Sequence, residues 1–161
     1  MESARIKLKE LELTDAAFVF EIVNTKEWVQ NIGDRNIKTI NDACAYIQKI
    51  IDNPNITYWI IYLANEEIKV GIISLVKRDY LQYPDIGFAL LPAYTGKGYA
   101  VEGAKLVLNS LIENKTYPVI TGVTLKENTK SIKLLEKLGL KFEKEIHVND
   151  EFLLLYSILL Y

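Results

Sequence analysis

Apolar and polar residues alternate in some stretches of the chain and recur at helical spacing in others. The alternating and β-rich runs predict strands over residues 4–13, 56–64, 68–78, 84–91, 118–125, 140–148 and 151–161. Helical spacing predicts four helices: one over residues 16–24, one between Thr39 and Pro54, one after Gly98 and one between Asn128 and Gly139. The order β-α-α-β-β-β-α-β-α-β-β predicts an α/β (α+β) mixed sheet with helices on it. No linker or repeat interrupts it, so we expect a single domain over residues 1–161.

Charge and composition limit the classes of partner. The chain has 19 basic and 21 acidic residues and a net charge of -2, which gives no general attraction to nucleic acid or to an anionic membrane. Cys44 and His147 are the only cysteine and histidine, so no disulfide and no zinc site is expected. The N-terminus lacks the apolar core of a signal peptide. We therefore expect a cytoplasmic protein without a metal.

Gly96, Lys97 and Gly98 form a short elbow where a β-rich run gives way to a helix-periodic one. Glycines permit positive φ and close approach of a bulky anion, and the first turn of a helix has free N–H groups that suit a pyrophosphate. The elbow is not a Walker A loop, because no Ser or Thr follows Lys97. It is not a dinucleotide fingerprint either, because Val101 stands three residues after Gly98. Taken alone, the pattern favours a simple turn and leaves phosphate binding open.

A second helix start strengthens the case for a ligand. Asn128 and Ser131 open the helix in "NTKSIKLLEKLGLKF", and both predicted helix starts follow parallel-looking strands. Where two neighbouring strands diverge, two such helix starts can grip one extended ligand.

Three segments together resemble the GNAT family of acetyl-CoA-dependent N-acetyltransferases, and within it the group related to the ribosomal-protein N-terminal acetyltransferases RimJ and RimL. They are "PDIGFALLPAYTGKGYAVEGA", "NTKSIKLLEKLGLKF" and "NIGDRNIKTINDACAYI", in the family's order and spacing. The resemblance covers nearly the whole chain. It implies a GNAT fold: one mixed, mostly antiparallel sheet of six to seven strands, flanked by about four helices and splayed between the fourth and fifth strands.

The resemblance also implies a site for acetyl-CoA as cosubstrate. The backbone of Leu90 and Leu91 would pair with the pantetheine arm, and Asn128 and Ser131 would contact the arm nearer the sulfur. The N–H groups that would face the pyrophosphate belong to Thr95, Gly96, Lys97, Gly98, Tyr99 and Ala100. The family pattern places Arg or Gln where this chain has Ala93, so backbone donors would form the cradle.

The implied reaction is direct attack of a primary amine on the acetyl thioester. Asp85 matches a position at which relatives carry a carboxylate and is the candidate base; alternatively it is a strand-start carboxylate that faces solvent. Ser131 is the candidate proton donor to the thiolate, or else a local backbone hydrogen-bonder. Leu135 stands where many GNAT enzymes have a tyrosine acid. The backbone N–H near Leu90 is a candidate to polarise the thioester carbonyl.

The acceptor is the least determined part of the prediction. Arg35 is a candidate to bind a substrate carboxylate or main chain; alternatively it forms a salt bridge in a surface loop. Tyr83 is one of several aromatic residues that could line an acceptor groove, with Trp28, Tyr58, Trp59 and Tyr80. An α-amine titrates near about 8 and needs less help from a base than a lysine, so a protein or peptide N-terminus is the leading acceptor. A small-molecule amine such as a polyamine, an amino acid or an antibiotic is an alternative, as is a non-catalytic acyl-CoA-binding module. We expect a monomer or homodimer.

Overall fold

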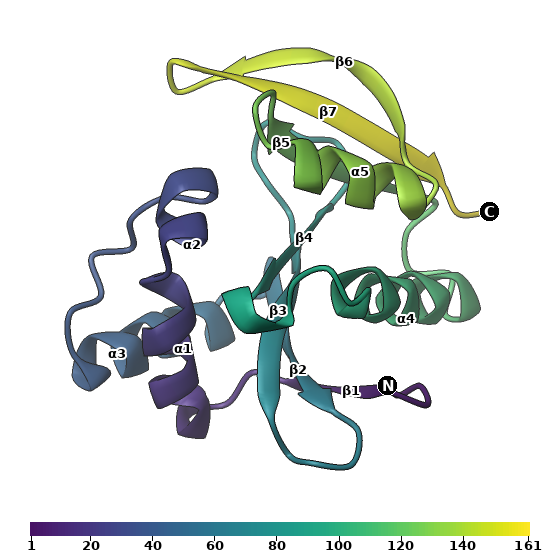
Figure 1. Ribbon diagram of the computed structural model, residues 1–161. Helices are drawn as coiled ribbons and strands as arrows, with labels where there is room; N and C mark the ends of the chain where they lie inside the picture. Colours follow the sequence, from purple (N-terminus) through teal and green to yellow (C-terminus); the bar gives the residue numbers. More distant parts are fainter.

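Residues 1–161 are described by a computed structural model, in which all seven predicted runs form strands of one sheet (Figure 1). The strands are β1 (Ile6–Glu10), β2 (Ile56–Leu63), β3 (Lys69–Val76), β4 (Asp85–Leu90), β5 (Val119–Leu125), β6 (Lys141–Val148) and β7 (Glu151–Leu159). Their order across the sheet is β1-β2-β3-β4-β5-β7-β6. Every neighbouring pair is antiparallel except β4 and β5, which are parallel. The prediction of a mixed, mostly antiparallel sheet is confirmed.

Five α-helices accompany the sheet, one more than the pattern predicted. They are α1 (Ala16–Val23), α2 (Lys26–Asn31), α3 (Ile40–Ile51), α4 (Tyr99–Glu113) and α5 (Thr129–Lys137). The unpredicted helix, α2, has only six residues and one buried side chain, Trp28, so it shows no apolar periodicity. The Thr25 side chain caps it by accepting a hydrogen bond from the Trp28 N–H. None of the helices has both the length and the apolar composition needed to cross a bilayer.

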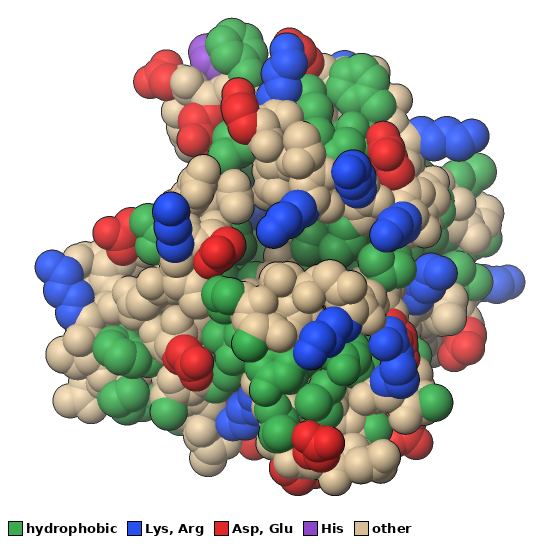
Figure 2. Space-filling view, viewed as in Figure 1, with side chains coloured by type: hydrophobic (Ala, Val, Ile, Leu, Met, Phe, Trp, Pro, Cys, Tyr) green, Lys and Arg blue, Asp and Glu red, His purple; other side chains and the backbone are tan.

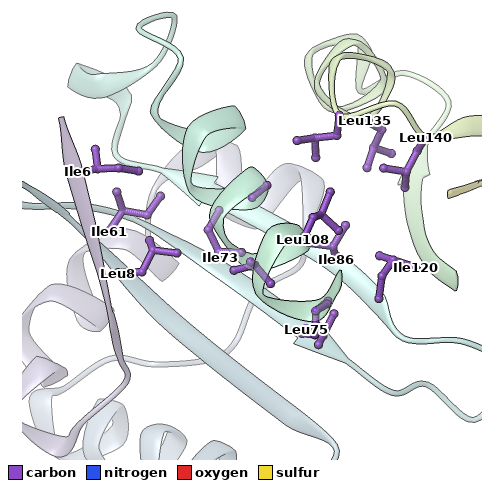
Figure 3. Packing of buried hydrophobic residues seen from close by; sticks show 14 of the residues in the cluster. Ile6, Leu8, Ile61, Ile73, Leu75, Ile86, Leu108, Ile120, Leu135 and Leu140 are labelled. Carbon is purple, nitrogen blue, oxygen red and sulfur yellow. The ribbon is translucent and has the colours of Figure 1, made fainter. Parts of the chain in front are cut away.

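The two faces of the sheet build two hydrophobic clusters, because successive side chains of a strand point to opposite faces. Ile61, Ile73 and Ile86 point to the face that carries α4 and α5, where they pack with Leu108 and other buried side chains (Figure 3). Their neighbours in sequence, among them Ile60 and Ile72, point to the other face and pack against α1 and α3. The sheet is therefore covered on both sides.

The sheet is interrupted between its two parallel strands. β4 and β5 share a single register pair, Asp85 with Thr121, and the Thr121 N–H donates to the Pro84 carbonyl at 2.9 Å. No further pair joins them, although β4 has six residues and β5 seven. The expected splay between the fourth and fifth strands is confirmed, and it opens a passage from one face of the sheet to the other.

Candidate active site

The gap between β4 and β5 opens into a cleft of about 780 Å³, within the range of small-molecule sites. Side chains from both faces of the sheet line it. Tyr58 and Ala89 belong to the face that carries α1 and α3, whereas Phe88 and Leu90 belong to the face that carries α4. The cleft thus allows two ligands to meet in the plane of the sheet, each approaching from its own face.

Asp85 lies at the point where the β4–β5 ladder ends. Its Oδ1 accepts a hydrogen bond from the Val123 N–H at 3.1 Å, and its Oδ2 accepts one from Arg78 Nε at 2.7 Å. Burial raises the pKa of Asp85 to about 6, although the Arg78 guanidinium and the Val123 N–H oppose the shift. Asp85 is only 3% exposed, so the alternative of a solvent-facing carboxylate is wrong. A carboxyl group with this pKa is suited to exchange protons near neutral pH.

Two backbone N–H groups of β4 point into the same gap. The Leu91 N–H donates to the Val70 carbonyl at 2.9 Å, which fixes the residues of β4 that pair with β3. Alternate residues of a strand direct their hydrogen-bonding groups to opposite sides. The N–H groups of Phe88 and Leu90 therefore face β5 beyond the point where the strands have parted. These donors suit an extended amide or a carbonyl oxygen.

The elbow at residues 96–98 leads into α4 in a conformation that requires glycine. Gly96 and Gly98 have φ angles of 76° and 85°, in the left-handed region that glycine adopts without a steric penalty. Gly98 is the N-cap of α4, and no side chain caps the first N–H groups of the helix. Gly96, Gly98 and Ala100 all line the cleft. Free N–H groups at a helix start attract anions, so this end of the cleft suits a phosphate.

Arg5 braces the elbow from outside the cleft. Its Nη1 donates to the Lys97 carbonyl at 3.0 Å, and its Nε donates to Glu102 Oε2 at 2.7 Å. The guanidinium also lies over the Tyr99 ring, 5.0 Å from the centroid. Arg5 does not line the cleft, so its contacts position the elbow and do not reach into the cleft.

Helix α5 begins across the cleft from the elbow. Asn128 is its N-cap, and the Asn128 side chain accepts a hydrogen bond from the Ser131 N–H at 3.2 Å. Ser131 is half-buried and lines the cleft, and its hydroxyl forms no hydrogen bond within the chain. The Ser131 hydroxyl is therefore free to contact a ligand. Leu135 is buried against Gly122 of β5, so an apolar side chain fills the position at which many GNAT enzymes have a tyrosine.

Hydrogen-bond donors surround Tyr58 on the face that carries α1 and α3. The Tyr58 and Tyr46 hydroxyl groups lie 3.4 Å apart. Burial and then Tyr46 raise the pKa of Tyr58, and the positive charges of Arg35 and Arg78 counter this shift, so both guanidinium groups lie near the Tyr58 hydroxyl. Arg35 lines the cleft and has no ion-pair partner. This half of the cleft therefore offers more donors than acceptors.

The structure brings most of the predicted site residues to the cleft. Those that line it are Arg35, Asp85, Leu90, Thr95, Gly96, Gly98, Ala100, Asn128 and Ser131. Four others do not line it: Tyr83, Leu91, Lys97 and Tyr99.

The four residues outside the cleft have contacts elsewhere. Leu91 is buried in the cluster with α1 and α3, and its N–H is taken by Val70. The Lys97 ammonium lies 5.6 Å from the centroid of the Tyr94 ring, and the Tyr99 ring lies under Arg5. The Tyr83 carbonyl accepts a hydrogen bond from Thr121 Oγ1 at 3.2 Å, while Tyr80 lines the cleft.

Some residues that shape the cleft gave no clear signal in the sequence. Arg78 follows β3, and only the pairing of β3 with β4 brings its guanidinium to Asp85. Residues of α2 form one wall, and this helix was not predicted. The Trp28 indole N–H is buried there without a hydrogen-bond partner. The lysines of α5 that line the cleft recur at helical spacing, a signal that was visible but also typical of any solvated helix face.

The family model and the relatives that match this chain are all acetyltransferases. The family model for the acetyltransferase (GNAT) domain matches residues 5–141. The uncharacterised N-acetyltransferase YjdG of Bacillus subtilis (strain 168) is 31% identical over 147 residues, which cover 86% of this chain and 88% of that protein. The spermidine N(1)-acetyltransferase of Escherichia coli (strain K12) is 25% identical over 146 residues, covering 88% of this chain and 75% of that protein.

A solved structure has the same architecture. RimL, a ribosomal L7/L12 α-N-protein acetyltransferase in complex with coenzyme A, superimposes with a TM-score of 0.83 over 98% of this chain and 95% of that one, at 14% identity. At this identity the likeness shows the fold alone. Together with the family model, which spans most of the chain, these findings show that the protein belongs to the GNAT family of acetyltransferases.

Proposed function

We propose that the protein transfers the acetyl group of acetyl-CoA to a protein or peptide N-terminal α-amine, by direct attack within a ternary complex. The observation that supports this most is the meeting of Asp85 with the free N–H groups of β4 in one gap. The elbow would hold the pyrophosphate, and β4 would pair with the pantetheine arm. The thioester would then lie beside the Leu90 N–H, and Asp85, at the other end of β4, would be linked to it through water.

The side chains around the gap have separate roles in this reaction. Asp85 takes the proton that the amine loses as the new C–N bond forms, through a chain of water molecules. The Leu90 N–H stabilises negative charge on the carbonyl oxygen. When the C–S bond breaks, the thiolate takes a proton from water or from the Ser131 hydroxyl, whose oxygen in turn regains a proton from solvent. A thiolate is a good leaving group, so the proposed reaction does not require a strong acid at the position of Leu135, where other members have a tyrosine.

Donors near Tyr58 favour an acceptor that carries carbonyl or carboxylate oxygens. Arg35, Arg78 and the Tyr58 hydroxyl offer hydrogen bonds on the face from which the acceptor approaches, and arginine binds planar oxygen pairs well. A peptide has backbone carbonyl groups beside its α-amine. A polyamine has only cationic groups, which the unpaired Arg35 repels; the charge of Arg78 is compensated by Asp85.

Spermidine is a second candidate because one relative is a spermidine acetyltransferase. Two exposed acidic residues of the cleft lining, Glu27 and Glu151, favour a cation at the rim. These carboxylates lie in exposed segments, whereas Asp85, the buried carboxylate of the lining, is already paired with Arg78. The interior of the cleft therefore favours a peptide over a polyamine.

An acceptor screen tests this proposal. Purified protein and acetyl-CoA are incubated with short peptides, with the same peptides blocked at the N-terminus, and with spermidine, and acetylated products are detected by mass spectrometry. We expect products from the free peptides only, and Arg35→Ala should raise KM for the peptide and leave KM for acetyl-CoA unchanged. Faster acetylation of spermidine than of every peptide would contradict the peptide assignment. Acetyl transfer that survives both Asp85→Asn and Ser131→Ala would contradict the catalytic roles.

The proposal also covers the setting of the enzyme. It would act in the cytoplasm as a single domain of residues 1–161, as a monomer or homodimer. Its partners would be acetyl-CoA and the amine acceptor, without nucleic acid, membrane or a metal ion.

A further inference from the structure

The floor of the cleft contains a depression on the face of the sheet that carries α1 and α3. Strand pairing aligns Tyr58 of β2, Ser74 of β3 and Gly87 of β4 in one row across the sheet, and all three line the cleft. A methyl group on Gly87 would lie 2.6 Å from Ser74 Oγ, so the glycine leaves the Ser74 hydroxyl uncovered. No hydrogen bond within the chain occupies that hydroxyl. The row therefore presents an open hydrogen-bonding group at the bottom of the depression.

Arg35 stands beside this row as a cation without a counter-ion. It lines the cleft and belongs to none of the ion pairs of the chain. Its neighbour in sequence, Asp34, accepts the Asn36 N–H at 2.7 Å, so that carboxylate is held in a turn of the loop. Burial raises the pKa of Tyr58 and the charge of Arg35 opposes the rise, as it would from a position near the Tyr58 hydroxyl.

Trp28 of α2 supplies another donor. Its indole N–H is buried without a hydrogen-bond partner, and the residue lines the same cleft. A buried donor of this kind lacks an acceptor, which an oxygen atom of a ligand can provide.

The acidic residues of the lining do not provide that oxygen. Asp85 is paired with Arg78, and Glu27 and Glu151 are exposed and belong to no ion pair. Figure 2 shows the molecule hollowed between the lobe with α2 and the lobe with α5, β6 and β7, with basic and acidic side chains along the border. The interior of this half of the cleft therefore has donors and a positive charge but no free carboxylate.

We propose that Arg35 and the hydroxyl groups of Ser74 and Tyr58 form a carboxylate subsite, which binds an acidic side chain at the first or second residue of the acceptor peptide. The inference rests on the proposed acetylation of peptide N-termini. A carboxylate compensates the charge of Arg35 and accepts two parallel N–H groups from it, whereas a neutral carbonyl group leaves the charge uncompensated.

The position of the subsite along β4 limits which residue of the peptide can reach it. Ser74 pairs with Gly87, two residues and about 7 Å along the strand from Ala89, beside which the thioester would lie. One extended residue spans at most about 3.6 Å, and an acidic side chain adds a similar reach. A carboxylate on the first or second residue can therefore meet the subsite while the α-amine meets the thioester.

The test compares kcat/KM for isomeric peptides that contain one glutamate at the first, second or fifth residue. The isomers have the same net charge, so a general attraction to the protein cancels. We expect glutamate at the first or second residue to raise kcat/KM by about tenfold over the isomer with glutamate at the fifth, mainly through KM, as one charge-assisted contact would. High salt should reduce this preference because Arg35 is exposed.

Charge reversal assigns the preference to one side chain. Arg35→Glu should abolish the advantage of the glutamate isomers and favour peptides with lysine at the same residue. The matched control is Lys38→Glu, which makes the same change of charge at an exposed residue of the same segment outside the cleft and should keep the preference. Ser74→Ala should reduce the preference and leave KM for acetyl-CoA unchanged.

The outcomes separate the subsite from the proposed function. Equal kcat/KM for all the glutamate isomers, or the same preference in Arg35→Glu as in the unsubstituted protein, would overturn the carboxylate subsite and leave the acetylation of peptides intact. Acetylation of none of the free peptides would overturn the proposed function, and the subsite with it.

Discussion

The Asp85 carboxylate accepts the Val123 N–H at 3.1 Å, on the edge of β5 that faces β4. In a continued parallel ladder that donor would go to a carbonyl of β4. The carboxylate therefore replaces a rung of the sheet at the place where the strands part, and the same group is the candidate base. The local fold and the proposed chemistry thus involve the same buried side chain, and its substitution should affect both.

The pH dependence of acetyl transfer should reflect the ionisation of the Asp85 carboxyl group. A base with a pKa of about 6 is protonated and inactive at lower pH, so kcat/KM should rise as pH increases through about 6 and then level off until the amine's own ionisation intervenes. Asp85→Asn should lower kcat/KM by about a hundredfold or more and remove this limb. A profile with the same limb in the Asn variant would assign the ionisation to another group.

Stability should depend on pH through the same residue, with the sign set by the raised pKa. The native state binds the Asp85 proton more tightly than the unfolded state, whose carboxyl titrates near 3.8. The resulting stabilisation is complete below pH about 4 and is lost as pH rises through about 6, a change of roughly 3 kcal/mol. Urea unfolding of the protein and of Asp85→Asn across this range checks it, and parallel stability curves would contradict the shift.

Gly98→Ala should weaken acetyl-CoA binding. A side chain at φ 85° is strained by about 1–2 kcal/mol, and relaxation of that strain would turn the N–H groups of the elbow. Kd for acetyl-CoA should rise by about tenfold. The matched control is Gly139→Ala at φ 92°, outside the cleft. It should cost similar stability and leave Kd unchanged; an equal Kd change in both variants would indicate a general effect of instability.

Arg5→Ala should test whether the contacts of Arg5 position the elbow at residues 96–98. Loss of the contacts with Lys97 and Glu102 should raise KM for acetyl-CoA by about threefold, a small effect because the pair is exposed, with kcat unchanged. The control is Lys7→Ala, which breaks a comparable surface ion pair, that of Lys7 with Glu67, away from the cleft. Steady-state kinetics should separate the two variants, and a fall in kcat for Arg5→Ala would place its effect on the chemical step.

Variants of Asn128 and Ser131 should distinguish a structural role at the start of α5 from a catalytic one. Asn128→Ala removes the cap of α5 and should cost about 1 kcal/mol of stability. Ser131→Ala removes a hydroxyl without a partner in the chain, so thermal stability should hardly change while kcat falls by about tenfold or more. An unchanged kcat for Ser131→Ala would leave water as the proton donor.

Strand alternation and the turn residues predicted the sheet well, because every strand except the exposed β6 buries side chains on at least one face and its period is therefore visible. Asn149 and Asp150 both adopt positive φ in the β6–β7 turn, as the predicted hairpin requires. Helix α2 was missed because six residues with one buried tryptophan carry no period.

The site was predicted where backbone geometry determines it and less well where side chains from distant segments meet. The glycines of the elbow and the start of α5 are local features, so their motifs identified them. The Arg78–Asp85 pair and the donors around Tyr58 depend on strand pairing and on a loop that places Arg35. The prediction for Tyr83 missed in the opposite way: Tyr80 and Asp85, before and after it in the sequence, line the cleft, but Tyr83 does not.

The measurement that tests the central claim most directly is acetylation of free N-terminal peptides by the protein and by Asp85→Asn, followed by mass spectrometry from pH 5 to 8. The account predicts that peptides gain one acetyl group at the N-terminus, with a rate that rises through pH about 6 in the protein and is nearly absent in the variant. Binding of acetyl-CoA should be retained in both. Equal rates for the protein and the variant, or no acetylated peptide at any pH despite bound acetyl-CoA, would contradict it.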